Sequence, residues 1–296
     1  MIFRNIITYF RKILMGYGFY ICVIFTVVLC FFADIYDMGY GNKYSAILSL
    51  IKFDREYMLN DISFCSFNVM QKGAGSWLTM FIPIISAFAF VPLVCDEYEA
   101  KSVRFEIFRS TKLCFYVSRF ITACLCGGLA VMLGFGLFTL TEYALFPNIS
   151  EYEVSIKTTF EESLGCQYPE FVQGGYAVII LEKLGNMFLY GVVCVAPVIT
   201  LTSVVRNKYL AMCIPFFLKY AMNQTCIKLQ SQAVLDIENV DAGLQKISMV
   251  LNPDALAYLY GYGDEKFIVL VYSCAIIVLS AALYLILCAR RFDCGE

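Results

Sequence analysis

Long apolar runs separated by polar segments dominate the chain, and their lengths predict membrane-spanning helices. Five runs contain few or no charged residues; they cover 13–33, 76–95, 120–141, 185–205 and 267–289. About 20 helical residues cross the roughly 30 Å hydrocarbon core of a bilayer, so each run is long enough to span it. The pattern therefore predicts an all-α, multi-pass membrane protein.

A sixth run at 209–222 is weaker because Pro215 and Lys219 interrupt it. As a helix its 14 residues rise only about 21 Å, too little for a span. The run becomes long enough if the helix continues through 223–229 and the Lys219 ammonium reaches outward to the headgroups.

We therefore expect one transmembrane domain over residues 1–296 with six spans. The spans cover about 13–33, 76–95, 113–141, 183–205, 208–226 and 267–289, and larger polar segments connect them at 34–75, 142–182 and 227–266. Segments this long usually fold over the membrane face or carry function.

The first twelve residues alternate apolar and basic positions. Ile2, Phe3, Ile6, Ile7 and Phe10 recur at helical spacing, between Arg4, Arg11 and Lys12. Two interpretations stay open: an amphipathic helix in the membrane interface, or a basic flank that only fixes topology. The run that follows is longer than a signal-peptide core and lacks a small-x-small cleavage site, so we expect no cleavage.

Charged residues are divided unevenly between the two sides that six spans create. Segments 1–12, 96–119, 206–208 and 290–296 share one side and hold 12 Lys and Arg residues against 6 Asp and Glu; the remainder holds 10 and 18. Short cytoplasmic segments are enriched in Lys and Arg. We therefore expect both termini in the cytoplasm. The expected location is a cell membrane, namely the bacterial plasma membrane.

Composition excludes several kinds of chemistry. The chain has no histidine, which removes histidine-based triads, most zinc sites and haem ligation. It has no Gly-Lys dipeptide and so no phosphate-binding P-loop. The net charge of −2 gives no basis for nucleic-acid binding. We therefore expect no catalytic residue, cofactor or metal site in this chain.

Residues inside the spans suggest close packing and kinks. Small residues let helices approach, and the third and fourth spans contain Gly127, Gly128, Gly134, Gly136, Gly185 and Gly191. Helix packing and a slot for a substrate or partner helix both stay open. Pro83, Pro92 and Pro197 permit kinks. Lys219 is the one charge expected near mid-membrane, which argues against an ion-coupled carrier.

Most of the 14 cysteines lie in apolar runs and are expected to be small buried hydrophobic residues. The polar segments contain Cys65, Cys166 and Cys226, enough for one disulfide with one thiol left over. Whether such a disulfide forms stays open.

The segment 95–119, CDEYEAKSVRFEIFRSTKLCFYVSR, lies between the second and third spans on the expected cytoplasmic side. Helical periodicity over 96–111 places Val103, Ile107 and Phe108 on an apolar side, opposite Lys101, Arg104, Glu106 and Arg109. The segment is either a topological anchor or a helix that docks on a soluble partner.

The combined pattern resembles the permease subunits of ABC-2-type ABC transporters. It has a basic N-terminal elbow helix, six spans, an acidic-then-basic segment after the second span and a short hairpin at 206–208. Glu99-Ala100 and the Arg/Ser/Thr-rich residues 109–112 leading to Arg119 occupy places typical of the family, although members often have Gly near position 100. Asn252-Pro253, before an expected re-entrant outside segment and the sixth span, resembles a recurrent Asn/Ser-Pro.

The resemblance implies a division of labour. Two permeases, alike or related, would form the pore, and two separate cytoplasmic ATPase subunits would hold ATP and Mg²⁺. The coupling helix at 96–111 would contact the ATPase through Glu97, Glu99, Val103, Arg104, Ile107 and Arg109. The implied activity is export of an amphipathic or hydrophobic substrate such as a peptide, lipid or drug-like molecule.

Two other classes of protein remain in view. One is a non-transporting immunity or sensor protein that binds a peptide or partner through its outside segments. The other is a membrane-embedded enzyme such as a lipid-modifying one, which the absence of histidine disfavours.

Overall fold

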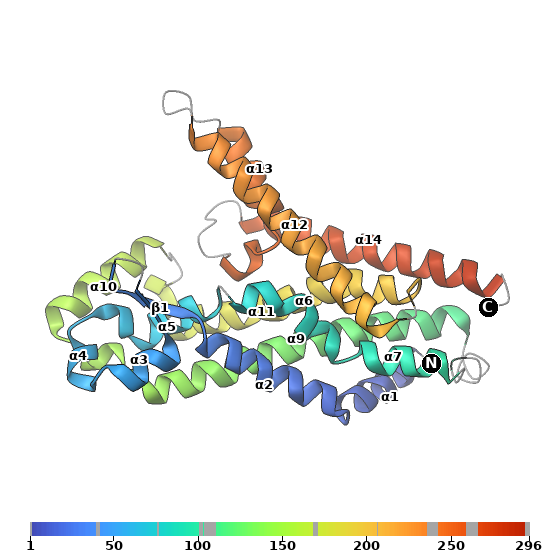
Figure 1. Cartoon of the computed structure of the whole chain (residues 1–296), viewed down its shortest axis with the longest axis horizontal. Coiled ribbons are helices and arrows are strands. Elements are labelled where there is room, and N and C mark those ends of the chain that lie inside the picture. The colour runs from blue at the N-terminus through green and yellow to red at the C-terminus, as the bar shows by residue number, and fades with distance from the viewer. Residues whose placement is uncertain are drawn as a thin grey trace.

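Long helices lie side by side along one axis of the molecule in the computed structural model (Figure 1). The structure describes residues 2–39, 42–75, 77–100, 103, 111–167, 171–205, 207–235, 242–258 and 266–293. The beginning of the first helix and the end of the last lie at the same end of the bundle, as the expected topology requires (Figure 1).

The N-terminal segment forms a helix, α1 (Ile2–Leu14), followed by α2 (Tyr17–Phe31) at an angle of 63°. Gly16 occupies the break with an extended backbone, outside either helix. A helix is therefore present there, and its place in the membrane interface stays a prediction. Its Tyr9 side packs on the bundle, whereas Phe3 is 74% exposed, so part of the apolar stripe has no partner within the described chain.

The second predicted span is two helices, α6 (Trp77–Phe88) and α7 (Val91–Glu99). Pro92 lies in the first turn of α7, where a backbone N–H has no intrahelical acceptor. The docking helix predicted to begin at residue 96 is wrong at that boundary. Residues 96–99 are the last turn of α7, because no helix-breaking residue separates them from Cys95.

Three further long helices complete the bundle. They are α9 (Lys112–Leu145), α11 (Phe171–Thr202), which is kinked at Gly175, and α14 (Lys266–Asp293). Four described helices are long and apolar enough to cross a membrane, namely Trp77–Glu99, Lys112–Glu151, Gly175–Thr202 and Lys266–Ala289, and the bent α1–α2 pair makes a fifth if it is one span. The described chain is therefore mainly helical, with enough long apolar helices for a multi-pass membrane protein.

The fifth predicted span, at 208–226, coincides with α12 (Lys208–Leu235), which continues well past residue 222. It is less apolar than the other long helices, since its second half carries Asn223, Gln224, Lys228 and Gln230. Together with α13 (Ala242–Leu251), which packs against it, α12 leans away from the bundle axis (Figure 1). Its crossing of the membrane stays a prediction.

Close packing of α9 against α11 forms the centre of the bundle. A Cβ atom on Gly191 would lie 2.9 Å from the Gly128 Cα atom, and one on Gly128 would lie 2.8 Å from the Phe188 carbonyl oxygen. These glycines therefore permit the crossing, as the helix-packing interpretation requires. Gly185 faces open space and has no such role.

The segment 34–75 folds as a small unit at the far end of the bundle, hereafter the outer module (Figure 1). Strands β1 (Asp34–Asp37) and β2 (Lys43–Ser45) form an antiparallel hairpin. Four short helices follow: α3 (Ala46–Lys52), α4 (Arg55–Leu59), the 3₁₀-helix η1 (Ile62–Phe64) and α5 (Ser66–Gly73). The second connection adds η2 (Ile149–Glu151) and α10 (Val154–Gln167) beside it.

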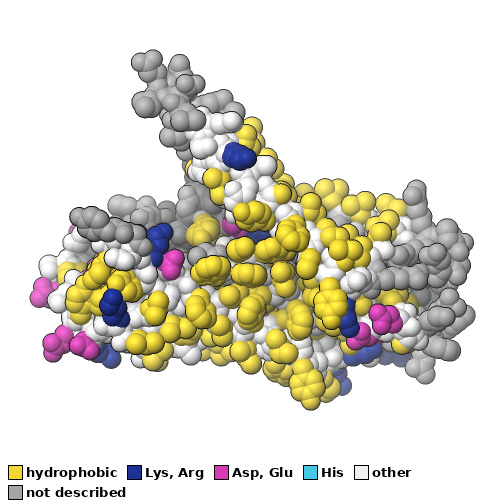
Figure 2. All heavy atoms as spheres, in the orientation of Figure 1, with side chains coloured by type: hydrophobic (Ala, Val, Ile, Leu, Met, Phe, Trp, Pro, Cys, Tyr) yellow, Lys and Arg dark blue, Asp and Glu magenta, His cyan; other side chains and the backbone are white. Residues whose placement is uncertain are grey.

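Hydrophobic side chains cover the middle of the face drawn in Figure 2, and charged side chains gather toward its two ends. Large exposed apolar residues occur along α2, α9, α12 and α14. This distribution matches an apolar belt between two aqueous faces.

Candidate functional site

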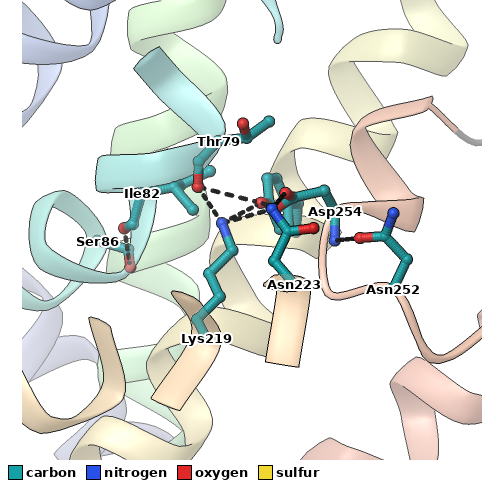
Figure 3. Close-up of polar contacts among 8 residues, drawn as sticks. Thr79, Ile82, Ser86, Lys219, Asn223, Asn252 and Asp254 are labelled. Atoms are coloured by element: carbon teal, nitrogen blue, oxygen red, sulfur yellow. Dashed lines mark hydrogen bonds and ion pairs between the residues drawn. The ribbon is translucent and has the colours of Figure 1, made fainter. Parts of the chain in front are cut away.

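Two clusters in the helical bundle contain buried charged side chains. The Glu97 cluster consists of Lys12, Glu97 and Arg119, where α1, α7 and α9 meet. The Lys219 cluster consists of Thr79, Tyr190, Lys219, Asn223 and Asp254 (Figure 3).

Glu97 connects three helices through one carboxylate. Its Oε2 atom lies 2.5 Å from Arg119 Nη2 on α9, and its Oε1 atom accepts a hydrogen bond from Lys12 Nζ on α1. Glu97 and Arg119 are only 6% and 3% exposed. A buried carboxylate needs this compensation, because an unpaired charge in the interior costs several kcal/mol.

Aromatic rings complete the surroundings of Arg119. Its guanidinium carbon lies 4.9 Å from the Tyr98 ring centroid and 5.6 Å from that of Phe115. Val103 is buried against Phe115 and Tyr9. A residue from the middle of the predicted docking segment therefore packs back onto the same cluster.

The last turn of α7 also contacts α12. The Lys208 Nζ atom lies 3.4 Å from Asp96 Oδ1, and both side chains are partly exposed to solvent. Residues 96 and 97 therefore join the end of α7 to α1, α9 and α12, directly before the segment that leads to α9.

The residues predicted to contact the ATPase lie in different surroundings in the structure. Glu97 and Val103 are buried inside the chain and come together around Phe115 and Arg119. Glu99 is exposed. The other three, Arg104, Ile107 and Arg109, lie outside the described residues.

A proline organises the Lys219 cluster. Pro83 has no N–H, so the Thr79 carbonyl oxygen one turn earlier lacks its helical hydrogen bond. That oxygen accepts instead from Lys219 Nζ and, at 3.4 Å, from the Tyr190 hydroxyl (Figure 3). Lys219 Nζ also lies 2.5 Å from the Tyr190 oxygen and 2.8 Å from Asp254 Oδ1.

Residues 252–258, the return segment, fold back against the bundle after α13. Asn252 Oδ1 accepts from the Asp254 N–H at 2.8 Å, and Asp254 Oδ2 accepts from Asn223 Nδ2 at 3.2 Å (Figure 3). Lys183 Nζ on α11 donates to the Ala257 carbonyl at 2.5 Å. Two buried lysines from different helices therefore fix this segment.

A cavity of about 340 Å³ lies between the return segment and the helices α6, α11, α12 and α14. Its lining is almost entirely apolar and includes one proline from each of α6, α11 and α12, together with one from the return segment: Pro83, Pro197, Pro215 and Pro253. Among the described lining residues, Lys219 is the one that carries a charge. Cavities of this size and composition are typical of sites for small, mostly apolar ligands.

The predicted orientation of Lys219 is wrong. Its side chain is 10% exposed and points into the bundle, because the Thr79 carbonyl and Asp254 solvate the ammonium better than a path to the surface. Two further charged residues, Lys183 and Glu142, are also buried, but they lie at the ends of predicted spans, so the prediction that Lys219 is the one charge near mid-membrane stays a prediction. One sequence signal was available: Pro83 leaves the Thr79 carbonyl without its helical hydrogen bond and so open to another donor. No feature of the residues near Lys219 indicated that Asp254 would be its partner.

The outer module is held by aromatic and ionic contacts. Tyr36 lies 4.6 Å from the Phe64 ring centroid, and Arg55 Nη2 lies 2.8 Å from Glu151 Oε2 in the second connection. The hydrogen bond between the Tyr36 and Tyr57 hydroxyls raises the pKa of Tyr36 to about 12. These contacts join the segments 34–75 and 142–182 into one unit.

The cysteines and the metal-ligating side chains offer no further site within the described chain. Cys65 and Cys226 are free and buried, and the side chain of Cys166 lies outside the described residues. Over the same described ranges, no group of three or more Cys, Asp and Glu side chains could hold a metal ion.

Comparisons with known proteins add no family. The chain matches no protein-family model, and no curated protein is similar to it. A functional proposal therefore rests on the residues themselves.

Proposed function

We propose that this chain is the permease subunit of an ATP-driven exporter of the ABC-2 type, which moves an amphipathic or hydrophobic substrate outward. The observation that carries the proposal is the connection of the last turn of α7 to α1, α9 and α12 through Glu97 and Asp96. A force applied next to this turn would be transmitted to all three helices.

The segment between α7 and α9 is where we propose that the ATPase subunits act. Exposed Glu99 and the sequence-predicted residues Arg104, Ile107 and Arg109 would contact the ATPase. Glu97 and Val103 have inward-facing side chains, so their part is to transmit the movement into the bundle.

α12 supports a path from this segment to the cavity. Lys208 contacts Asp96 at one end of the helix, and Lys219 holds Asp254 beside the cavity. The two lysines are separated by 11 residues, a helical rise of about 16 Å. Movement of α7 would therefore shift the helix that fixes the return segment.

Partner subunits complete the proposed transporter. The chain has no P-loop, so two separate cytoplasmic subunits would bind ATP and Mg²⁺, and this chain would have no ATPase activity of its own. A second copy or a related permease would line the pore through the exposed apolar helices. We propose the bacterial plasma membrane as the location, with both termini in the cytoplasm.

The test is ATPase activity that depends on this chain. The full-length protein would be purified from its native membrane in mild detergent, and copurifying subunits would be identified by mass spectrometry. We expect a subunit with a P-loop and ATP hydrolysis in the eluted complex. The Arg104→Glu/Arg109→Glu variant should lose about tenfold or more of that activity, because reversed charges at a contact cost several kcal/mol.

The matched control is Arg55→Glu, which reverses an exposed charge in the outer module. It should leave the copurified ATPase activity unchanged. Absence of any P-loop subunit, or equal activity in the charge-reversed variant and the control, would contradict the proposed function.

A second candidate is a non-transporting immunity or sensor protein that binds a peptide through its outer module. The folded state of that module, with its Tyr36, Phe53 and Phe64 rings in contact, favours this candidate. It predicts that Arg55→Glu, and not the Arg104→Glu/Arg109→Glu change, alters the phenotype in intact cells.

A further inference from the structure

The charge that lines the cavity beside the return segment is balanced by partners within the chain. The one charged residue of the described lining, Lys219, has three N–H donors and three oxygen partners, on Thr79, Tyr190 and Asp254. The ammonium is therefore fully compensated inside the chain. The cavity offers no unpaired charge among its described lining residues.

An anionic ligand would have to displace Asp254 from Lys219. Asp254 is 10% exposed, and its remaining partners would be the neutral Tyr190 hydroxyl and Asn223 amide. Leaving a buried carboxylate without its cation is strongly unfavourable. A cationic ligand would meet the same obstacle, because it would have to displace Lys219 from Asp254.

The described side-chain groups of the lining that are still free to form hydrogen bonds are uncharged. Asn252 Oδ1 is occupied by the Asp254 N–H, which leaves the Asn252 amide N–H₂ without an acceptor in the described structure. Tyr272 also lines the cavity, and its hydroxyl has no hydrogen-bond acceptor in the described structure either. Both groups can donate to an ester, ketone or hydroxyl oxygen.

We propose that this cavity binds an uncharged, lipid-like molecule: an alkyl or acyl chain that carries a neutral hydrogen-bond acceptor. The chain lies among the proline and aliphatic side chains, and the acceptor faces the donors of Asn252 and Tyr272. Lys219 and Asp254 do not bind the ligand but hold the return segment beside it. The inference that this molecule is transported rests on the proposed function, whereas the inference that it binds in the cavity does not.

Photo-crosslinking tests the proposal without any ATPase subunit. The purified protein in lipid nanodiscs is exposed to a long-chain fatty alcohol carrying a diazirine, and labelled peptides are identified by mass spectrometry. The matched probe is the fatty acid of the same chain, at a mildly alkaline pH where it is ionised. We expect labels on 269–276 and 193–201, and about tenfold less labelling by the acid at equal concentration.

Two variants with matched controls locate the label. Ile276→Trp fills the cavity from α14, whereas Leu279→Trp enlarges an exposed residue of the same helix. Leu218→Trp narrows the cavity from α12, and Phe217→Trp is its control, because Phe217 is about as exposed as Leu218 but does not line the cavity. Labelling of the lining should fall in Ile276→Trp and Leu218→Trp and persist in both controls.

Three results would overturn the proposal. They are equal or stronger labelling of the lining by the fatty acid, label confined to the exposed apolar surface, and labelling that both cavity variants leave unchanged in folded protein. Because the experiment contains only this chain, each result leaves the ATPase test untouched. Loss of the ATPase association would in turn leave ligand binding intact.

Discussion

At the scale of single residues, two buried glutamates have opposite surroundings. Glu97 is enclosed by Arg119 and Lys12. Glu142 is 1% exposed, and its Oε2 atom has no hydrogen-bond partner in the described part of the chain. Ionisation is compensated at the first position and costly at the second. Removal of the charge should therefore have different consequences at the two sites.

Glu97→Gln should destabilise the protein by about 3–5 kcal/mol, because it leaves Arg119 buried without a counterion. The measurement is the apparent melting temperature of the purified protein in detergent. Glu99→Gln is the matched control, since Glu99 is exposed two residues later on the same helix. A loss of the same size in both variants would show that the Glu97 cluster does not hold these helices together.

Glu142→Gln should leave the melting temperature unchanged or raise it. The amide keeps the shape of the side chain and removes the cost of a buried carboxyl group that lacks a cation. Glu142→Lys at the same position should be strongly destabilising, because it introduces a buried charge. A Glu142→Gln protein that melts as early as Glu97→Gln would contradict this account of the site.

Single residues were predicted from sequence only as far as their own segment determines them. Lys219 was recognised as a charge in an apolar run, but its direction was predicted wrongly. Its partners belong to other segments: the Thr79 carbonyl lies 140 residues away in sequence, and Asp254 follows α13. Burial, by contrast, depends mainly on how apolar a residue's own segment is. Most cysteines of the apolar runs, such as Cys22, Cys30 and Cys126, were therefore correctly predicted to be buried.

At the scale of elements, one ion pair joins α12 to the return segment. Asp254→Ala should destabilise the protein by about 3–5 kcal/mol, because Lys219 stays buried without an anion. The Lys219→Met/Asp254→Asn double variant should be more stable than Asp254→Ala, since it removes both charges. Apparent melting temperatures of these two variants and of the single variants Lys219→Met and Asp254→Asn give the comparison.

The coupling between these changes is the decisive quantity. If losses from Lys219→Met and Asp254→Asn simply add in the double variant, the pair does not hold the return segment. An exposed lysine on the same helix, Lys228, provides the control: Lys228→Met should change the melting temperature little.

The contact between α9 and α11 depends on glycine at its closest point. Gly191→Leu should reduce the yield of folded protein, because even a Cβ atom there would lie 2.9 Å from Gly128 Cα. Gly185→Leu, on the same helix, is the control, since nothing lies within 4 Å of its Cβ position. Size-exclusion profiles of the two variants should differ clearly. Equal profiles would mean that the helices can separate without loss of fold.

Helices were predicted well where a long apolar run determines them, and poorly at their ends and between them. The apolar runs ending at 95 and 141 correspond to α6–α7 and α9. The boundary at 96 was missed because a charge pattern marks the membrane edge, not the end of a helix. The β1–β2 hairpin was missed because only seven residues form it, and tertiary contacts stabilise them.

At the scale of the whole molecule, the open question of the fold is whether α12 crosses the membrane. Five other candidate spans follow from length and apolarity, if the bent α1–α2 pair is one of them. With five spans and a cytoplasmic N-terminus, the C-terminus would lie outside. That arrangement would place Arg290 and Arg291 on the side where short segments carry few basic residues.

Six spans therefore predict that both termini are cytoplasmic. Short epitope tags at the N-terminus, after Gly39 in the outer module and at the C-terminus should reveal it through antibody binding to intact and permeabilised cells. We expect the tag after Gly39 to be accessible in intact cells and both terminal tags only after permeabilisation. The outer-module tag controls for expression and the N-terminal tag for membrane integrity. A C-terminal tag accessible in intact cells would mean that α12 does not cross, and the Lys219 cluster would then lie near the membrane surface.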